Sequence, residues 1–138
     1  MERYLYFRAQ ATDGDDEATD DSACFPASSL MGMAPSGDTT LGLFFKPMIR
    51  RTPSGNEPDA NASFDNHDKI SLTIPANTHL TAMKAITKAI VTGKSFTNNN
   101  FLPALIIVAN NDSGGTEYLE GSGITSCAAI VVNPAYSN

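Results

Sequence analysis

Hydrophobic residues recur mainly at every second position of this chain, which is the spacing of half-buried β-strands. Near the N-terminus, Tyr4 and Tyr6 fall on one face and Leu5 and Phe7 on the other, and aromatic residues at this density favour a pleated sheet. The run 102–109 is almost entirely apolar, as is typical of a strand covered on both faces. The pattern predicts strands at residues 3–10, 39–49, 68–75, 102–109 and 126–132.

One segment follows the helical period instead. Its apolar side chains recur at steps of three and four and predict one buried face, formed by Leu80, Met83, Ile86 and Ile90. Lys84 and Lys88 share the opposite, solvent-facing side. Asn77 or Thr78 can cap the start of this helix, and Gly93 follows its last periodic residue as a stop.

The remaining segments are rich in polar residues and turn formers. Residues 13–21 include six acids and predict a solvated loop, and residues 28–38 predict a short helical turn or an irregular packed segment. Residues 50–67 and 110–123 predict long polar connections. No repeat or second domain is visible, so residues 1–138 are interpreted as a single domain.

The order of elements is therefore β-β-β-α-β-β. Because helix and strands do not alternate, this order disfavours a doubly wound parallel sheet. It predicts a strand-dominated α+β fold: a mostly antiparallel sheet, or a small open barrel, with one amphipathic helix.

Composition and charge narrow the class of partner. Fifteen acids and nine bases leave a net charge of -6, and only 17% of residues are charged. A general nucleic-acid binder needs a basic surface, so nucleic acid is not an expected partner. The one basic cluster, Lys46, Arg50 and Arg51, lies next to Phe44 and is typical of a protein interface, where arginine and aromatic residues are enriched. Contact with single-stranded nucleic acid is the alternative reading of this cluster.

The N-terminal residues 1–10 lack the apolar run of a signal peptide, and no stretch approaches the ~18 apolar residues of a membrane helix. We therefore expect synthesis in a reducing cytosol and no membrane association. On that basis Cys24 and Cys127 are predicted to be reduced, the alternative being one disulfide that spans most of the chain.

Two partial site motifs occur in the sequence, and neither is complete. Gly93-Lys94-Ser95 resembles part of a phosphate loop, but position 88 is lysine where the motif needs glycine, and the tripeptide ends a helix instead of opening one. The alternating acids Asp13, Asp15 and Glu17 resemble part of a calcium loop, but the glycine and the closing glutamate are not in place. Whether the loop 13–21 holds a loosely bound cation stays open.

Histidine and cysteine chemistry is equally unsupported. His67, His79, Cys24 and Cys127 are not spaced as zinc ligands, and a Cys-His pair would require proximity that the spacing does not indicate. We therefore predict no catalytic, cofactor-binding or metal-binding residue, and no enzyme.

Several segments together resemble short proteins encoded by marine bacteriophages, cyanophages especially, and found in ocean metagenomes. The residues that carry the resemblance are 3–8 (RYLYFR), 24–29 (CFPASS), 31–33 (MGM), 43–48 (LFFKPM) and 70–74 (ISLTI). The resemblance implies an uncharacterised or virion-associated protein, made in the host cytoplasm and located in the virion, with a capsid or tail protein as partner. None of the shared segments is a catalytic motif.

The leading hypothesis is a phage virion structural or accessory protein that self-assembles or decorates a capsid or tail. Its expected interface residues are Tyr4, Tyr6, Phe44, Arg50 and Arg51. An alternative is a small open-barrel binding module of Sm-like type for nucleic acid or peptide. A third, a small hydrolase, would need a pocket that holds one of the two histidines beside a carboxylate or thiol.

Overall fold

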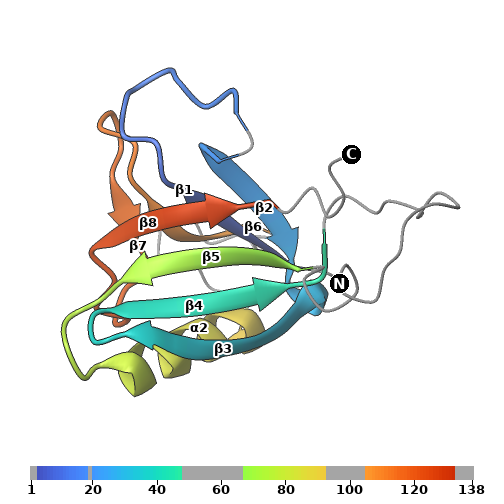
Figure 1. The fold of residues 1–138 in the computed structure, drawn as a ribbon, viewed down its shortest axis with the longest axis vertical. Coiled ribbons are helices and arrows are strands. Elements are labelled where there is room, and N and C mark those ends of the chain that lie inside the picture. The colour runs from blue at the N-terminus through green and yellow to red at the C-terminus, as the bar shows by residue number, and fades with distance from the viewer. Residues whose placement is uncertain (1–2, 19, 48–66, 93–104, 133–138) are drawn as a thin grey trace, which may run out of the picture.

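The computed structural model describes residues 3–18, 20–47, 67–92 and 105–132 (Figure 1). It contains a strand-dominated α+β fold with one α-helix among these residues, as predicted. The elements in chain order are β1 (Tyr4–Arg8), β2 (Ser22–Pro26), the 3-10 turn η1 (Ala27–Ser29), β3 (Leu30–Gly37), β4 (Thr40–Phe45), β5 (Asp68–Thr73), α2 (His79–Thr92), β6 (Leu105–Asn110), β7 (Glu117–Tyr118) and β8 (Ser126–Val131).

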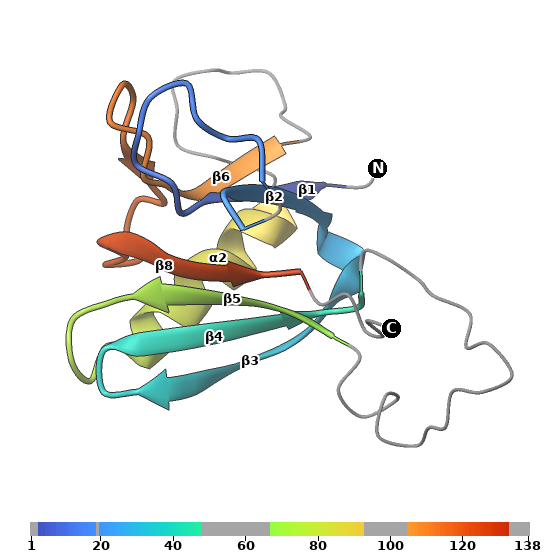
Figure 2. The same cartoon turned by 45° about the horizontal axis from the view of Figure 1, so that its top comes forward.

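The strands form two four-stranded sheets. The first sheet has the order β2-β1-β6-β7, and the second has the order β3-β4-β5-β8. Every pairing is antiparallel except that of β1 with β6, which is parallel. The predicted, mostly antiparallel arrangement is therefore confirmed, in the form of two sheets (Figure 2).

Three strands were not predicted. Residues 30–37 form the eight-residue strand β3, where an irregular segment or helical turn was expected, and only the short turn η1 is helical. The glycines and Pro35 that suggested a turn are accommodated because β3 is an outer strand with two register shifts against β4. Strand β2 lies in residues 22–26, for which the sequence predicts no element. Strand β7 lies within the predicted connection 110–123, and its two residues are too few to show alternation.

The core lies between the inner faces of the two sheets. Three phenylalanines from three strands meet there: Phe25 stacks on Phe45 with ring centroids 4.2 Å apart, and Phe7 meets Phe45 edge-on at 5.9 Å. Leu5 of β1 and Leu43 of β4 are also fully buried. The two sheets therefore share one hydrophobic core.

Helix α2 packs on this core beside β4 and β6 (Figure 2). It begins directly after Thr78, whose carbonyl accepts a hydrogen bond from the Ala82 N–H at 3.1 Å and whose hydroxyl donates to the Pro75 carbonyl. The expected stop, Gly93, lies outside the described residues.

The buried face of α2 is narrower than predicted. Ala82, Ile86 and Ala89 are buried, whereas Leu80, expected on the same face, is 63% exposed. The alanines have small side chains, so the helix approaches the sheets along the Ile86 side, and Leu80 is turned toward solvent. Lys84 and Lys88 are exposed, as expected.

Candidate assembly surface

Strand β1 presents the two faces that its alternation predicts. Leu5 and Phe7 point into the core and are fully buried. Tyr4 and Tyr6 point to the outer side of the first sheet, where Tyr4 is 40% exposed and Tyr6 is half-buried. The two tyrosines therefore lie together on an outer sheet surface, which is where an interface role requires them.

The sheet register adds further apolar side chains to this surface. Tyr4 lies opposite Leu105 of β6, and Tyr6 lies opposite Ile107. Leu105 is 43% exposed and Ile107 is half-buried, so β6 is covered fully only on its inner face, in contrast to the prediction.

On the other side of β1, Tyr4 lies opposite Pro26 of β2 and Tyr6 lies opposite Cys24. Side chains opposite one another across neighbouring strands point to the same face of a sheet. The result is a contiguous apolar surface, called here the outer patch and formed by Tyr4, Tyr6, Cys24, Pro26, Leu105 and Ile107. Four of these residues were missed because the strand register that brings them beside Tyr4 and Tyr6 is not visible in the sequence.

Phe44 does not join the outer patch. It lies on the outer face of the second sheet, half-buried, with the His67 ring edge-on at 5.5 Å and the Lys69 ammonium over its ring at 5.4 Å. The other two expected interface residues, Arg50 and Arg51, lie outside the described residues.

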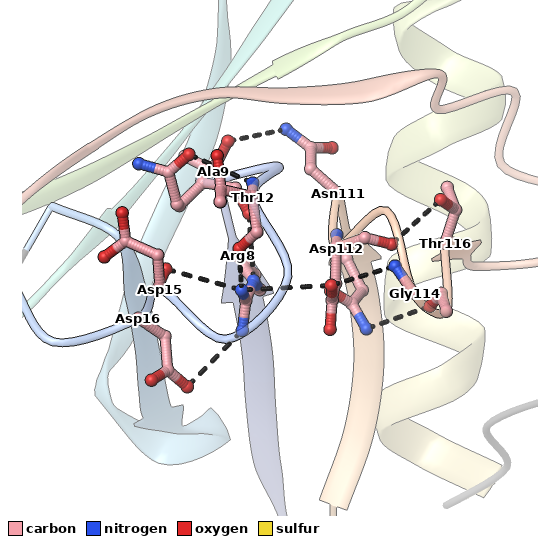
Figure 3. Close-up of polar contacts among 12 residues, drawn as sticks. Arg8, Ala9, Thr12, Asp15, Asp16, Asn111, Asp112, Gly114 and Thr116 are labelled. Carbon is pink, nitrogen blue, oxygen red and sulfur yellow. Dashed lines mark hydrogen bonds and ion pairs between the residues drawn. The ribbon is translucent and has the colours of Figure 1, made fainter.

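The acidic loop is organised around the buried Arg8 (Figure 3). The Arg8 side chain is 6% exposed, donates to the backbone carbonyls of Gln10 and Thr12 at 2.9 and 2.8 Å, and lies 3.4 Å from the Asp16 carboxylate and 3.9 Å from that of Asp112. Burial alone lowers the pKa of Arg8, but its neighbours more than offset this effect, so the pKa is raised and the charge is retained.

The loop itself faces solvent, as predicted, with residues 13–18 and 20 exposed. Among the described residues, no group of three or more histidine, cysteine, aspartate or glutamate side chains could hold a metal ion. Of the loop carboxylates, that of Asp16 contacts Arg8.

A single amide joins the two sheets near this loop. The Asn111 amide nitrogen donates to the carbonyl of Ala9 at 3.0 Å (Figure 3). It also donates to the carbonyl of Cys127 at 2.9 Å. Its oxygen accepts from the Cys127 N–H at 3.0 Å and from the Tyr118 hydroxyl at 2.8 Å. Asn111 thus ties the end of β1 and β7 to the start of β8, a structural role.

The histidines and cysteines considered for catalysis occupy separate settings. His79 contacts the carbonyls of Gly37 and Thr40 with its Nε2, at 2.9 and 3.1 Å, and so fixes the β3–β4 turn. Both cysteines are free thiols, as predicted. Cys24 is exposed, and its pKa is raised by partial burial, whereas deeper burial raises the pKa of Cys127 to about 12.

A shallow hollow of about 300 Å³ lies beside α2. Its described lining residues are Thr81, Lys84, Ala85, Lys88, Ala89, Thr92, Glu120 and Gly121. Neither Lys84 nor Lys88 forms an ion pair with a described residue. The exposed Leu80 and Val91 flank the two lysines.

None of the helices in the described part of the chain has the length and hydropathy needed to cross a bilayer. Comparisons with known proteins assign the chain to no group, since no family model, no curated protein and no solved structure matches it.

Proposed function

We propose that this chain is a non-catalytic structural protein of a phage virion, which assembles with further copies through its outer patch and decorates a capsid or tail. The observation that carries this proposal is the outer patch itself. Two of its exposed members, Tyr4 and Leu105, come from neighbouring strands and lie side by side on one face.

The outer patch is not needed to fill the core. The opposite face of the same strands already supplies Leu5, Phe7 and Ile106, which are fully buried. Contiguous apolar surface that the monomer leaves in solvent is typical of an interaction site. The low charge content and the resemblance to virion-associated phage proteins support a structural role over a catalytic one.

A matched pair of substitutions tests the role of the outer patch. Leu105→Lys places a charge in the patch, and Leu80→Lys places the same charge at an exposed leucine on α2. Light scattering after gel filtration should show an oligomer for the parent chain and for Leu80→Lys, and a smaller but still folded species for Leu105→Lys. A strictly monomeric parent chain at high concentration would refute assembly, and dissociation by Leu80→Lys alone would place the interface on the helix.

A separate measurement tests whether the chain is a component of a virion. Mass spectrometry of purified particles of a phage that encodes this chain should detect it in a fixed ratio to the major capsid or tail protein. Its presence only in the lysate would contradict the virion role and leave self-assembly standing.

The runner-up function is a small binding module for a peptide or for nucleic acid. The hollow beside α2 favours an acidic peptide, because Lys84 and Lys88 are free to bind carboxylates beside the exposed Leu80. Nucleic acid is less well supported, because Lys69 already lies over the ring of Phe44 on which a base would stack.

Fluorescence titration with an acidic, leucine-containing peptide tests this alternative. Binding that weakens with salt and is lost in Lys84→Glu, but kept in Lys46→Glu, would favour the module. No binding at low salt would remove it.

A further inference from the structure

Strand β2 is one of the two edge strands of the first sheet and, among the described strands, is hydrogen-bonded to β1 alone. Two backbone hydrogen bonds frame this pair of strands. The Ala9 N–H donates to the Asp21 carbonyl at 2.8 Å, and the Ala27 N–H donates to the Arg3 carbonyl at 2.7 Å.

These two bonds determine which backbone groups of β2 face away from β1. Bonded and non-bonded pairs alternate along an antiparallel ladder, and counting from either framing bond makes Leu5–Phe25 a bonded pair and Tyr6–Cys24 a non-bonded pair. The N–H and C=O of Cys24, and likewise those of Ser22, therefore point toward the open edge of the sheet.

The other three sheet edges carry features that obstruct pairing. Strand β3 contains Pro35 and two register shifts, and β7 is two residues long. On β8, Asn111 already occupies both the N–H and the C=O of Cys127. Among the described strands, β2 has the only edge without such an obstruction along its centre.

The sequence of β2 also suits pairing. Ser22–Pro26 (SACFP) contains no charged residue, and its one proline stands at the last position. An uncharged, unprotected edge is a template for another strand.

We propose that β2 pairs antiparallel with β2 of a second copy of this chain, with Cys24 at the centre of the pair. This inference rests on the proposed function, self-assembly, and specifies how two copies meet. Centred in this way, the two Cys24 residues exchange two hydrogen bonds. Each Ser22 N–H donates to the Pro26 carbonyl of the other copy, which uses its second lone pair because it already accepts from the Ser29 hydroxyl at 2.7 Å. The missing N–H of Pro26 removes a bond only at each end of the pair.

Charge favours this register over a shifted one. Centring on Cys24 pairs the five residues of β2 with one another and leaves Asp20 and Asp21 outside the pair. A shift toward Ala23 would place Asp21 opposite Phe25 of the other copy, where the carboxylate would meet an apolar neighbour.

Pairing would join two first sheets into one continuous sheet with both outer patches on the same face. The exposed Tyr4 and the half-buried Tyr6 of the two copies would then form one larger apolar surface. That surface is the one through which further copies assemble in the proposed function, so edge pairing and the outer patch are two separate contacts of one assembly.

The central position of Cys24 makes the pairing measurable. The Cα atoms of a hydrogen-bonded antiparallel pair are about 5.5 Å apart, within the range that a disulfide spans. Diamide oxidises the two exposed thiols to a disulfide, and its azo group takes up the two electrons and two protons and becomes a hydrazine. The linked dimer is then seen on a non-reducing gel.

The control carries a thiol elsewhere: Cys24→Ser combined with Ser113→Cys, since Ser113 is exposed in the β6–β7 loop. Cross-linking through Cys24 should be about tenfold or more faster than in this control, because pairing raises the effective concentration of the thiols. Cys127→Ala should cross-link like the parent chain. In light scattering, Cys24→Lys should shift the chain toward monomer, whereas Cys24→Ser should remain dimeric.

Failure of this inference is distinguishable from failure of the proposed function. An oligomer of the parent chain that cross-links no faster than the control would overturn edge pairing while self-assembly stands. A strict monomer of the parent chain would overturn both.

Discussion

Cys127 is a buried thiol whose ionisation the fold opposes. It is 2% exposed, and burial raises its pKa from an ordinary 9.0 to about 12. Above pH 9 the unfolded chain therefore loses this proton while the folded chain keeps it. The free energy of unfolding should fall between pH 9 and 12, by up to about 4 kcal/mol at pH 12.

Urea unfolding at a series of pH values measures this loss, with Cys127→Ala as the control. The substitution should flatten the alkaline part of the profile, leaving a smaller decline from Tyr118, whose pKa is raised by burial and then by the neighbouring Cys127. An unchanged slope in Cys127→Ala would show that another group carries the effect.

At the scale of the element, a few buried side chains attach helix α2 to the hydrophobic core. Ile86 is fully buried, so Ile86→Ala should lower the free energy of unfolding by about 2 to 5 kcal/mol, as other large-to-small core changes do. Lys84→Ala and Leu80→Ala should each change it by less than about 0.5 kcal/mol, because both side chains are largely in solvent.

Denaturation midpoints of the three variants separate these effects. Comparable losses from Ile86→Ala and Leu80→Ala would mean that the helix is rotated relative to the structure. The helical period of the apolar residues predicts that both side chains are buried, whereas the structure buries only Ile86. This measurement decides between the two.

The regular elements were predictable where the local pattern is strong. Strand β5 alternates Ile70 and Leu72 with polar residues, and its prediction is confirmed. Strand β3 was missed because Gly32 and Pro35 weaken the signal. They are tolerated at a sheet edge, and edge position is a property of the tertiary structure.

At the scale of the whole molecule, the proposed assembly is driven by apolar contact and not by charge. Raising the salt concentration to about 0.5 M screens ionic contacts beyond a few ångströms and leaves apolar burial in place. Light scattering should therefore show an undiminished oligomer in high salt. Neutralising two loop acids, as in Asp20→Asn with Glu17→Gln, should also leave it intact, because these exposed residues lie outside the outer patch.

Dissociation in high salt would contradict an apolar interface. It would instead indicate an ionic interface, in which Lys84 and Lys88 of α2 contact acidic residues of another copy. Leu105→Lys supplies the positive control, since it should dissociate the same oligomer in low salt.

The sequence by itself determined that β1 has two apolar faces, Tyr4 and Tyr6 on one and Leu5 and Phe7 on the other, because side-chain direction alternates along any strand. It also determined the charge balance and the existence of the helix, which depend on composition and short-range period. Only the tertiary structure decided that Leu105 lies beside Tyr4, since their pairing joins residues distant in the chain. It likewise decided which side of α2 is buried. The period of the apolar residues defines an apolar face, but burial depends on which elements pack against the helix.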